Sequence, residues 1–366
     1  MDHMVPFLEK SIMSKVVNSS YENLAFVPNA TSGVNTVLRS LKFEKGDTIL
    51  ITNLIYGACR NTIDYVVSRN ELKLEVLQLE YPSTDEEILG KFESALNSET
   101  NPSKSPIKLC FFDAVASMPG IKLPFAQIVN LCKRYNTLSF IDGAHSIGMV
   151  PIDLDQLQPD FYVSNLHKWL YCARGCAILY VTPDHQGLYH SEVQPFPISH
   201  VYHGAKFYEK FLFNASNNYS SYLAVGSALK FIDDVCGGLD NIMDYCNELR
   251  TDAIKLFKND LGLEVLENSE GSISSFLFNV FVGGLSESRV EYLKLHMVDP
   301  IWYEEMRTFI FDILVNEYHT FIAFGLFNGK LYLRFSSQIY LDLEEFKLGY
   351  SWFADALERF LKHQGV

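Results

Sequence analysis

Short apolar runs that alternate with helical segments are the feature that most constrains this chain. The strand-like runs span residues 47–53, 73–79, 107–113, 138–142, 161–165 and 176–181, and the helical segments span 34–41, 56–69, 85–96 and 124–134. Almost wholly apolar strands separated by helices are typical of a parallel sheet that helices cover on both faces. This part of the chain is therefore predicted to be an α/β domain with a mainly parallel sheet.

The pattern changes after about residue 236. A long amphipathic segment spans residues 237–260, strand-like runs follow at 274–282 and 330–336, and helical segments lie at 301–317 and 342–362. Runs of helix and strand in this order favour a smaller α+β domain. The predicted division is a large domain over residues 1–236 and a small C-terminal domain over residues 237–366.

The composition and charge of the chain exclude some classes of binding partner and indicate where the protein is located. With 366 residues and 48% hydrophobic content, the chain can bury a sizeable core, and its formal net charge is −14 with scattered Lys and Arg. This charge argues against a nucleic-acid or anionic-membrane partner. The sequence has no 18-residue apolar stretch and no apolar leader, so a soluble, cytoplasmic protein is expected. Seven cysteines without framework spacing favour reduced thiols, and no metal site is expected.

The ends of the predicted strands are where candidate site residues are expected, because ligands of open parallel sheets bind outside the carboxyl ends of the strands. The segment "FVPNATSGVNTVL" offers Thr31 and Ser32 just before a predicted helix. Small and hydroxyl residues at a helix start leave backbone N–H groups free to hold an anion such as phosphate. The alternative is an ordinary helix cap at Asn29 followed by a turn glycine.

An aspartate ends the next strand of interest. In "LSFIDGAHS", Asp142 follows a buried strand, Gly143 and Ala144 leave room for a flat group, and His145 comes three residues after the aspartate. A buried carboxylate is costly unless a cationic partner meets it. A buried Asp that caps the next segment or pairs with an Arg is the alternative.

A lysine follows the strand at 161–165. The block "FYVSNLHKW" places Ser164, Asn165, His167 and Lys168 there, and desolvation of a lysine favours the amine form that a Schiff base requires. An isolated lysine is more often a surface residue. An anion cradle, an aspartate and a lysine 26 residues later nevertheless match the phosphate, the pyridine nitrogen and the aldehyde of pyridoxal 5′-phosphate.

Three sequence blocks carry a family resemblance. The blocks "PNATSGVN", "IDGAHSIG" and "SNLHKWLYCARGCAILYV" resemble class V aminotransferase-fold (fold-type I) enzymes, a group with cysteine desulfurases, selenocysteine lyases and isopenicillin N epimerase-like proteins. Within this group, "NLIYGACRNTIDYV" and "HKWLYCARGCAILYV" are most similar to fungal hercynylcysteine sulfoxide lyases of ergothioneine biosynthesis. The resemblance is close over roughly residues 24–230.

The resemblance implies a role for each matching residue. It implies that Lys168 binds the cofactor covalently, that Asp142 holds the pyridine nitrogen protonated, and that His145 lies against the ring. The other implied residues are Thr31, Ser32, Ser164 and His167 for the phosphate, Ser216 for the phosphate of the neighbouring subunit in a homodimer, Tyr56 for stacking or acid catalysis, Asp113 and Ser117 for the substrate or 3′-oxygen side, and Arg334 for the substrate carboxylate. Packing for Tyr56 and a surface ion pair for Arg334 are the alternatives.

Two departures from the family pattern bear on activity. Only 29 residues precede Ala30, whereas the family has a longer N-terminal segment, so a truncated or divergent member is expected, with tight cofactor binding and poor catalysis. Ala215-Ser216 also replaces the commoner Gly-Thr pair, which weakens the expected contact between subunits.

The reaction expected is a β-elimination. Persulfide-forming desulfurases of this family use a mobile cysteine before the C-terminal arginine strand, and "EYHTFIAFGLFNGKLYLRF" contains none. A carbon–sulfur lyase acting on a cysteine-derived thioether or sulfoxide, with pyruvate and ammonia as products, is therefore favoured. The alternatives are an epimerase, a transaminase, a desulfurase-like enzyme of the same fold, and a degenerate protein that is not catalytic.

Overall fold

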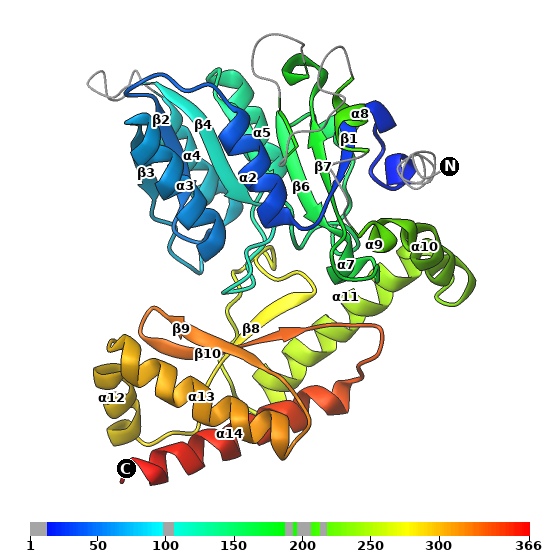
Figure 1. The fold of residues 1–366 in the computed structure, drawn as a ribbon. Coiled ribbons are helices and arrows are strands. Elements are labelled where there is room, and N and C mark those ends of the chain that lie inside the picture. Colours follow the sequence, from blue (N-terminus) through cyan, green and yellow to red (C-terminus); the bar gives the residue numbers. More distant parts are fainter. Residues whose placement is uncertain (1–12, 98–105, 187–192, 196–205, 213–217) are drawn as a thin grey trace. The chain divides into compact units, whose positions relative to one another are not determined.

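The computed structural model describes residues 13–97, 106–186, 193–195, 206–212 and 218–366 (Figure 1). The chain divides into two compact units. Unit 1 comprises Met1–Ser117 and Lys122–Met243, and unit 2 comprises Met118–Ile121 and Asp244–Val366. The division into domains at residue 236 stays a proposal.

Unit 1 contains a seven-stranded sheet with the order β1-β7-β6-β5-β4-β2-β3. Its strands are β1 (Leu24–Val27), β2 (Thr48–Thr52), β3 (Lys73–Leu77), β4 (Ile107–Asp113), β5 (Leu138–Asp142), β6 (Phe161–Asn165) and β7 (Ala177–Val181). The pairs from β3 to β6 are parallel, whereas β7 is antiparallel to both β6 and β1. The predicted mainly parallel α/β sheet is confirmed.

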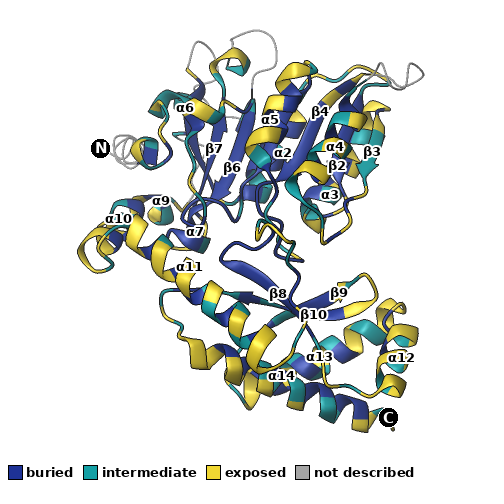
Figure 2. Ribbon diagram, turned by 180° about the vertical axis from the view of Figure 1, so that it is seen from behind, coloured by how far each residue is buried: buried dark blue, intermediate teal, exposed yellow. Residues whose placement is uncertain are grey.

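Helices cover both faces of this sheet. The helices are α2 (Ala30–Ser40), α3 (Gly57–Asn70), α4 (Asp85–Leu96), α5 (Phe125–Arg134), α6 (Leu154–Leu157), α7 (Leu166–Trp169), α8 (Phe207–Lys210), α9 (Ser220–Leu223) and α10 (Val225–Asp234). On β4, Phe111 belongs to the cluster formed with α2 and α3, whereas its neighbour Phe112 packs edge-on against Phe92 of α4. Successive residues face opposite sides of a strand, so both sides of β4 are buried (Figure 2).

Unit 2 is built on a three-stranded antiparallel sheet with the order β8-β10-β9. The elements are β8 (Leu277–Phe281), β9 (Ala323–Phe327), β10 (Lys330–Ser336), α12 (Glu287–His296), α13 (Pro300–Asn316) and α14 (Leu343–His363), and α11 (Leu239–Lys255) runs from unit 1 into unit 2 before a π-helical turn at Leu256–Asp260. Phe278 and Phe335 lie opposite each other in the sheet and stack on each other, and Phe257 stacks with Phe335 and contacts Phe278 at a tilt. The predicted smaller α+β part is confirmed.

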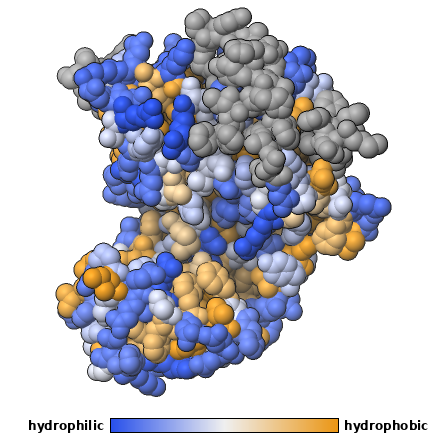
Figure 3. Space-filling model, viewed as in Figure 1, coloured by the Kyte–Doolittle hydropathy of each residue, from blue (hydrophilic) through white to orange (hydrophobic). Residues whose placement is uncertain are grey.

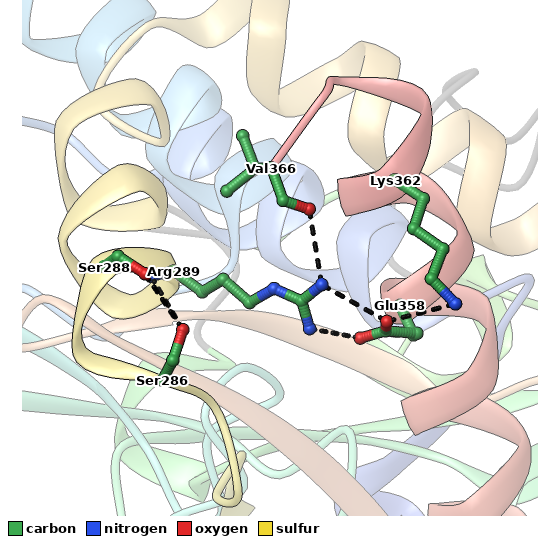
Figure 4. Close-up of polar contacts among 6 residues, drawn as sticks. All are labelled: Ser286, Ser288, Arg289, Glu358, Lys362 and Val366. Atoms are coloured by element: carbon green, nitrogen blue, oxygen red, sulfur yellow. Dashed lines mark hydrogen bonds and ion pairs between the residues drawn. The ribbon is translucent and has the colours of Figure 1, made fainter.

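A polar cluster joins α12 to α14 in unit 2 (Figure 4). Arg289 donates both guanidinium nitrogens to the carboxylate of Glu358, and one of them also lies 3.3 Å from the carbonyl oxygen of Val366. Lys362 adds a second cation 3.3 Å from the same carboxylate. Both hydrogen bonds from Arg289 lower the pKa of Glu358, which keeps this carboxylate charged near neutral pH.

Hydrophobic and hydrophilic residues are interspersed on the described part of the face drawn in Figure 3. Among the described residues, no helix is both long enough and apolar enough to span a membrane.

Candidate active site

Acidic residues end two adjacent strands of the sheet in unit 1. Asp113 at the end of β4 and Asp142 at the end of β5 are direct partners in the parallel register, and Val163 of β6 is the partner of Asp142 on the other side. Because parallel strands end at one edge of the sheet, both carboxyl groups lie at the same edge. This is the edge at which ligands of such sheets bind.

The Asp142 side chain is held by two hydrogen bonds and is only 3% exposed. Its Oδ1 accepts a hydrogen bond from the backbone N–H of Ala144 at 3.0 Å, and its Oδ2 accepts one from the Cys59 thiol at 3.4 Å. Burial raises the pKa of the Asp142 carboxyl, and the bond from Ala144 offsets part of the rise. A cation at this carboxyl would stabilise its charged form.

Asp113 is buried with an unsatisfied oxygen. Its side chain is 4% exposed, and its Oδ2 has no hydrogen-bond partner among the described residues. Burial and then the neighbouring carboxyl of Asp142 raise the pKa of Asp113 well above its ordinary value. A buried polar atom without a partner marks a position where a further polar group is expected.

The turn after Asp142 is closely packed. A Cβ on Gly143 would clash with Ser146 and with the ring of Tyr162, so the space beside this glycine is filled by protein atoms. The expectation that Gly143 leaves room for a flat group is therefore wrong. Ser164 is fully buried, and its hydroxyl donates to the carbonyl oxygen of Gly143 at 2.5 Å, which holds this turn against β6.

Lys168 lies on the short helix α7, directly after β6. Its Nζ is 2.8 Å from Nε2 of His145, and the indole Nε1 of Trp169 donates to Nδ1 of the same imidazole at 3.1 Å. His145 is 7% exposed and Trp169 is 3% exposed. These contacts join the turn after β5 to the lysine after β6.

Helix α2 starts beside the end of β6. The backbone N–H of Ala30 donates to Oδ1 of Asn165 at 2.9 Å, and the N–H of Ser32 donates to Oδ1 of Asn29 at 2.8 Å. Two of the first N–H groups are thus already bonded, contrary to the expectation that they stay free for an anion. Thr31 and Ser32 lie inside the first turn, are half-buried, and can offer their hydroxyl groups.

The remaining candidate residues in unit 1 differ in how far they are exposed. His167 is half-buried, and its Nδ1 lies 2.8 Å from the backbone carbonyl oxygen and 3.3 Å from the backbone nitrogen of Cys176. Burial lowers the pKa of His167. Tyr56 precedes α3 and is 52% exposed, and Ser117 is half-buried in the segment after β4.

Two candidates lie elsewhere. Arg334 belongs to β10 of unit 2, where burial lowers the pKa of its guanidinium. A Cβ on Gly120, which also belongs to unit 2, would come within 3.3 Å of its side chain. The side chain of Arg334 is therefore partly buried rather than fully exposed. Ser216 lies outside the described residues, and its role stays a prediction.

Two residues of the site were not among the predicted ones. Cys59 bonds Asp142 across 83 positions of the sequence, and Trp169 bonds His145 across 24 positions. Trp169 follows Lys168 directly, so its closeness to the lysine was the available signal. The pairing of Cys59 with Asp142 has no local sequence signal.

The residues at this edge fit the polar groups of pyridoxal 5′-phosphate. Lys168 supplies an amine, the buried carboxyl of Asp142 suits a protonated ring nitrogen, and the hydroxyls of Thr31 and Ser32 suit a phosphate. The unsatisfied oxygen of Asp113 leaves one further acceptor at the same edge. The roles of the individual residues stay proposals.

Comparison with known sequences agrees with this chemistry. The profile of the aminotransferase class-V family matches residues 9–293. Hercynylcysteine sulfoxide lyase of Schizosaccharomyces pombe is 29% identical over 343 residues, which are 91% of this chain and 79% of the relative. The L-cysteine desulfhydrase-like protein lolT1 of Epichloe uncinata is 26% identical over 365 residues, or 92% of this chain and 80% of that protein.

Solved structures share the fold. The cysteine desulfurase of Thermococcus onnurineus NA1 matches with a TM-score of 0.73 and 17% identity, over 98% of this chain and 85% of that chain. The cystine C-S lyase C-DES, in complex with cysteine persulfide, matches with a TM-score of 0.73 and 17% identity, over 97% of this chain and 87% of that chain. The family expected from the sequence is thereby confirmed: the chain belongs to the aminotransferase class-V family, and its cofactor is pyridoxal 5′-phosphate.

Proposed function

We propose that this chain is a carbon–sulfur lyase that uses pyridoxal 5′-phosphate for β-elimination from a cysteine-derived thioether or sulfoxide. Hercynylcysteine sulfoxide is the first candidate substrate, which would assign the chain to ergothioneine biosynthesis. The observation that carries the proposal is the Lys168 amine beside His145 at the edge that Asp142 occupies. The relatives named as a lyase and as desulfhydrase-like support the same reaction class.

The cysteines support elimination over persulfide transfer. All seven lie within the described residues, and six of them are buried, while Cys236 after α10 is half-buried. A cysteine that takes sulfur from a substrate must reach it as a thiolate. Burial instead raises the pKa of Cys59, the thiol next to Asp142, well above its ordinary value. This thiol is therefore protonated and unsuited to accept sulfur.

The proposed chemistry assigns one task to each residue. When bound, pyridoxal 5′-phosphate supplies an electron sink for negative charge on the α-carbon of an amino acid. Lys168 is the proposed base for the α-proton, and Asp142 the proposed holder of the ring-nitrogen proton. Tyr56, with its side chain exposed, is the proposed donor of a proton to the leaving sulfur. Arg334 is the proposed ligand of the substrate carboxylate.

The other proposed site residues bind the cofactor phosphate or the substrate. Thr31, Ser32, Ser164 and His167 are proposed phosphate ligands, with Asp113 and Ser117 on the substrate side. The hydroxyl of Ser164 already donates to Gly143, so its proposed role is the most indirect of the set. A homodimer and a cytoplasmic location are also proposed.

A second candidate substrate is free L-cysteine, which the desulfhydrase-like relatives favour. It would undergo the same β-elimination with hydrogen sulfide as the leaving group. The purified protein should therefore be incubated in parallel with hercynylcysteine sulfoxide and with L-cysteine, and pyruvate, ammonia and sulfide should be measured. Faster pyruvate release from the sulfoxide supports the first candidate, and faster release with sulfide from L-cysteine supports the second.

Two variants control this experiment. Lys168→Ala should abolish pyruvate release from either substrate. Lys133→Ala should leave it unchanged, because within the described part of the chain the exposed amine of Lys133 donates to the carbonyl oxygen of Leu157 and to no site residue. Alanine with a protein persulfide, or an epimerised amino acid without pyruvate, would overturn the proposed lyase reaction.

A further inference from the structure

The imidazole of His145 has a fixed protonation pattern because both of its nitrogens are engaged. Nδ1 lies 3.1 Å from the indole nitrogen of Trp169, and Nε2 lies 2.8 Å from Nζ of Lys168. An indole N–H donates and never accepts. Nδ1 of His145 must therefore be the acceptor, with its lone pair free of a proton.

The unprotonated Nδ1 of His145 also fixes the direction of the hydrogen bond between Nε2 of His145 and Nζ of Lys168. A histidine that accepts at Nδ1 is not an imidazolium, so its one proton is on Nε2. Nε2–H then donates to Lys168, and Nζ of Lys168 must accept. An ammonium has three donors and no acceptor, so the geometry requires Lys168 to be a neutral amine.

We propose that Trp169 is a positioning residue: its indole N–H fixes His145 in the Nε2–H tautomer, and His145 in turn keeps Lys168 as a neutral amine with its lone pair directed at the imidazole. This relay of two hydrogen bonds sets the protonation state of the lysine in the protein without its cofactor. It is independent of which reaction the protein catalyses, because it concerns only the lysine and its two neighbours.

Packing holds Trp169 in the position that the relay needs. Trp169 is buried, and a Cβ on Gly148 would lie only 2.7 Å from its carbonyl carbon and 3.1 Å from its Cβ. Gly148 has a φ of +87°, which favours glycine at this point. The turn that carries His145 and the helix that carries Trp169 are thus packed in direct contact.

The charged and titratable groups around Lys168 are compatible with a neutral amine. Its electrostatic neighbours among the described residues include Asp113 of β4, Asp142 of β5, Cys59 of α3 and the adjacent His167. Burial raises the pKa of both carboxyls and of the thiol, which weakens the negative field that would favour an ammonium, and a positive charge on Lys168 would offset part of each rise. Burial lowers the pKa of His167, so this ring adds no charge near neutral pH.

The relay matters when the lysine meets an aldehyde. Once its lone pair turns away from the Nε2–H of His145, a neutral amine could add to an aldehyde carbon, and the aldehyde oxygen would leave as water with the two amine protons. An ammonium must first lose a proton to solvent. Trp169 therefore favours the uptake of pyridoxal 5′-phosphate near neutral pH, although it is not required to touch the cofactor.

The tautomer can be measured without any substitution. Two-bond ¹H–¹⁵N correlations in cofactor-stripped, ¹⁵N-histidine-labelled full-length protein distinguish Nδ1–H from Nε2–H, and His145→Gln identifies the signal of His145. The expected result is a protonated Nε2 and an unprotonated Nδ1. A proton on Nδ1, or on both nitrogens, at neutral pH would overturn the proposal.

A second experiment tests the effect on Lys168. Trp169→Phe keeps an aromatic ring and removes the N–H, whereas the matched control Trp302→Phe removes a buried indole N–H that has no hydrogen-bond partner among the described residues. The rate at which cofactor-stripped protein takes up pyridoxal 5′-phosphate is measured against pH for both variants. Circular dichroism monitors their folding.

Loss of one hydrogen bond should slow uptake near neutral pH roughly two- to tenfold in Trp169→Phe and move the midpoint of the pH profile up by about 0.4 to 1 unit. Trp302→Phe should match the wild type in both rate and midpoint. A folded Trp169→Phe variant with an unchanged midpoint would contradict the relay, even if its uptake were slower at every pH.

Discussion

Replacing Asn165 by alanine tests how the start of α2 is held. Asn165 precedes α7, but its side chain does not cap that helix. Its Oδ1 instead accepts the N–H of Ala30, and the residue is 6% exposed. Asn165→Ala leaves this buried N–H without an acceptor, which costs about 1–3 kcal/mol.

The magnitude can be read from amide exchange. A loss of about 1–3 kcal/mol corresponds to roughly 5- to 150-fold faster hydrogen exchange at Ala30, provided that exchange follows local opening. Mass spectrometry of peptides covering the first turn of α2 measures this change. Thr31 and Ser32 lie in the same turn, so weaker binding of pyridoxal 5′-phosphate should accompany faster exchange.

Asn316→Ala is the matched control. The Asn316 amide is exposed and donates only to Asp312 one turn earlier in α13, so its removal should change stability by less than about 0.5 kcal/mol. Unchanged exchange at Ala30 in Asn165→Ala would refute the reasoning, because it would mean that the observed bond does not hold the helix start.

Three further predictions concern unit 1. A Cβ in Gly33→Ala would lie 2.6 Å from Cγ2 of Val163, a stiff side chain on a central strand, so unfolding by denaturant should show a loss of about 1–3 kcal/mol. Burial alone raises the pKa of Asp160, but hydrogen bonds from His185 and Ser139 outweigh it and lower the pKa. The resulting stabilisation is complete above the unfolded pKa of about 3.9 and is lost as pH falls through the lower folded pKa, so the stability gap between wild type and Asp160→Asn should shrink below about pH 4. Asp142→Asn should still bind pyridoxal 5′-phosphate but lose most turnover, because an amide cannot stabilise a protonated ring nitrogen by charge; wild-type turnover would exclude the proposed role.

The elements that were predicted well are those with a strong local pattern. The strand expected at 107–113 is β4, and the helix expected at 85–96 is α4, where Thr84 and Glu87 form a capping box. Each of these segments combines a clear apolar period with polar or turn residues at its ends. Such segments specify their conformation before any tertiary contact forms.

The elements that were missed depend on distant partners or on weak local signals. Strand β1 has four residues and is formed by pairing with β7, about 150 positions later in the sequence. Helix α2 begins at Ala30, four residues before the predicted start at 34, because Asn29 caps it. The start was missed because Thr, Ser and Gly in the first turn have low helix propensity. Strand β9 and helix α12 in unit 2 were also missed.

In the site, too, the features with a local sequence signal were predicted, and the features that depend on distant contacts were not. The carboxyl-end rule indicated Asp142 as a residue of this edge, and Asp113, which only the resemblance implied, proves to be its direct partner in the parallel register. Gly143 was misinterpreted because the ring of Tyr162, which fills the space beside it, comes from the neighbouring strand β6. Contacts of this kind depend on tertiary packing, which one sequence does not reveal.

The attachment of the cofactor to Lys168 is the central claim, and one measurement tests it most directly. The purified protein is reduced with borohydride, digested, and mapped by mass spectrometry for a pyridoxyl group. The account predicts this group on Lys168, in the peptide that contains His167 and Trp169, and no modified peptide in Lys168→Ala. A pyridoxyl group on any other lysine of the wild-type protein would contradict the account.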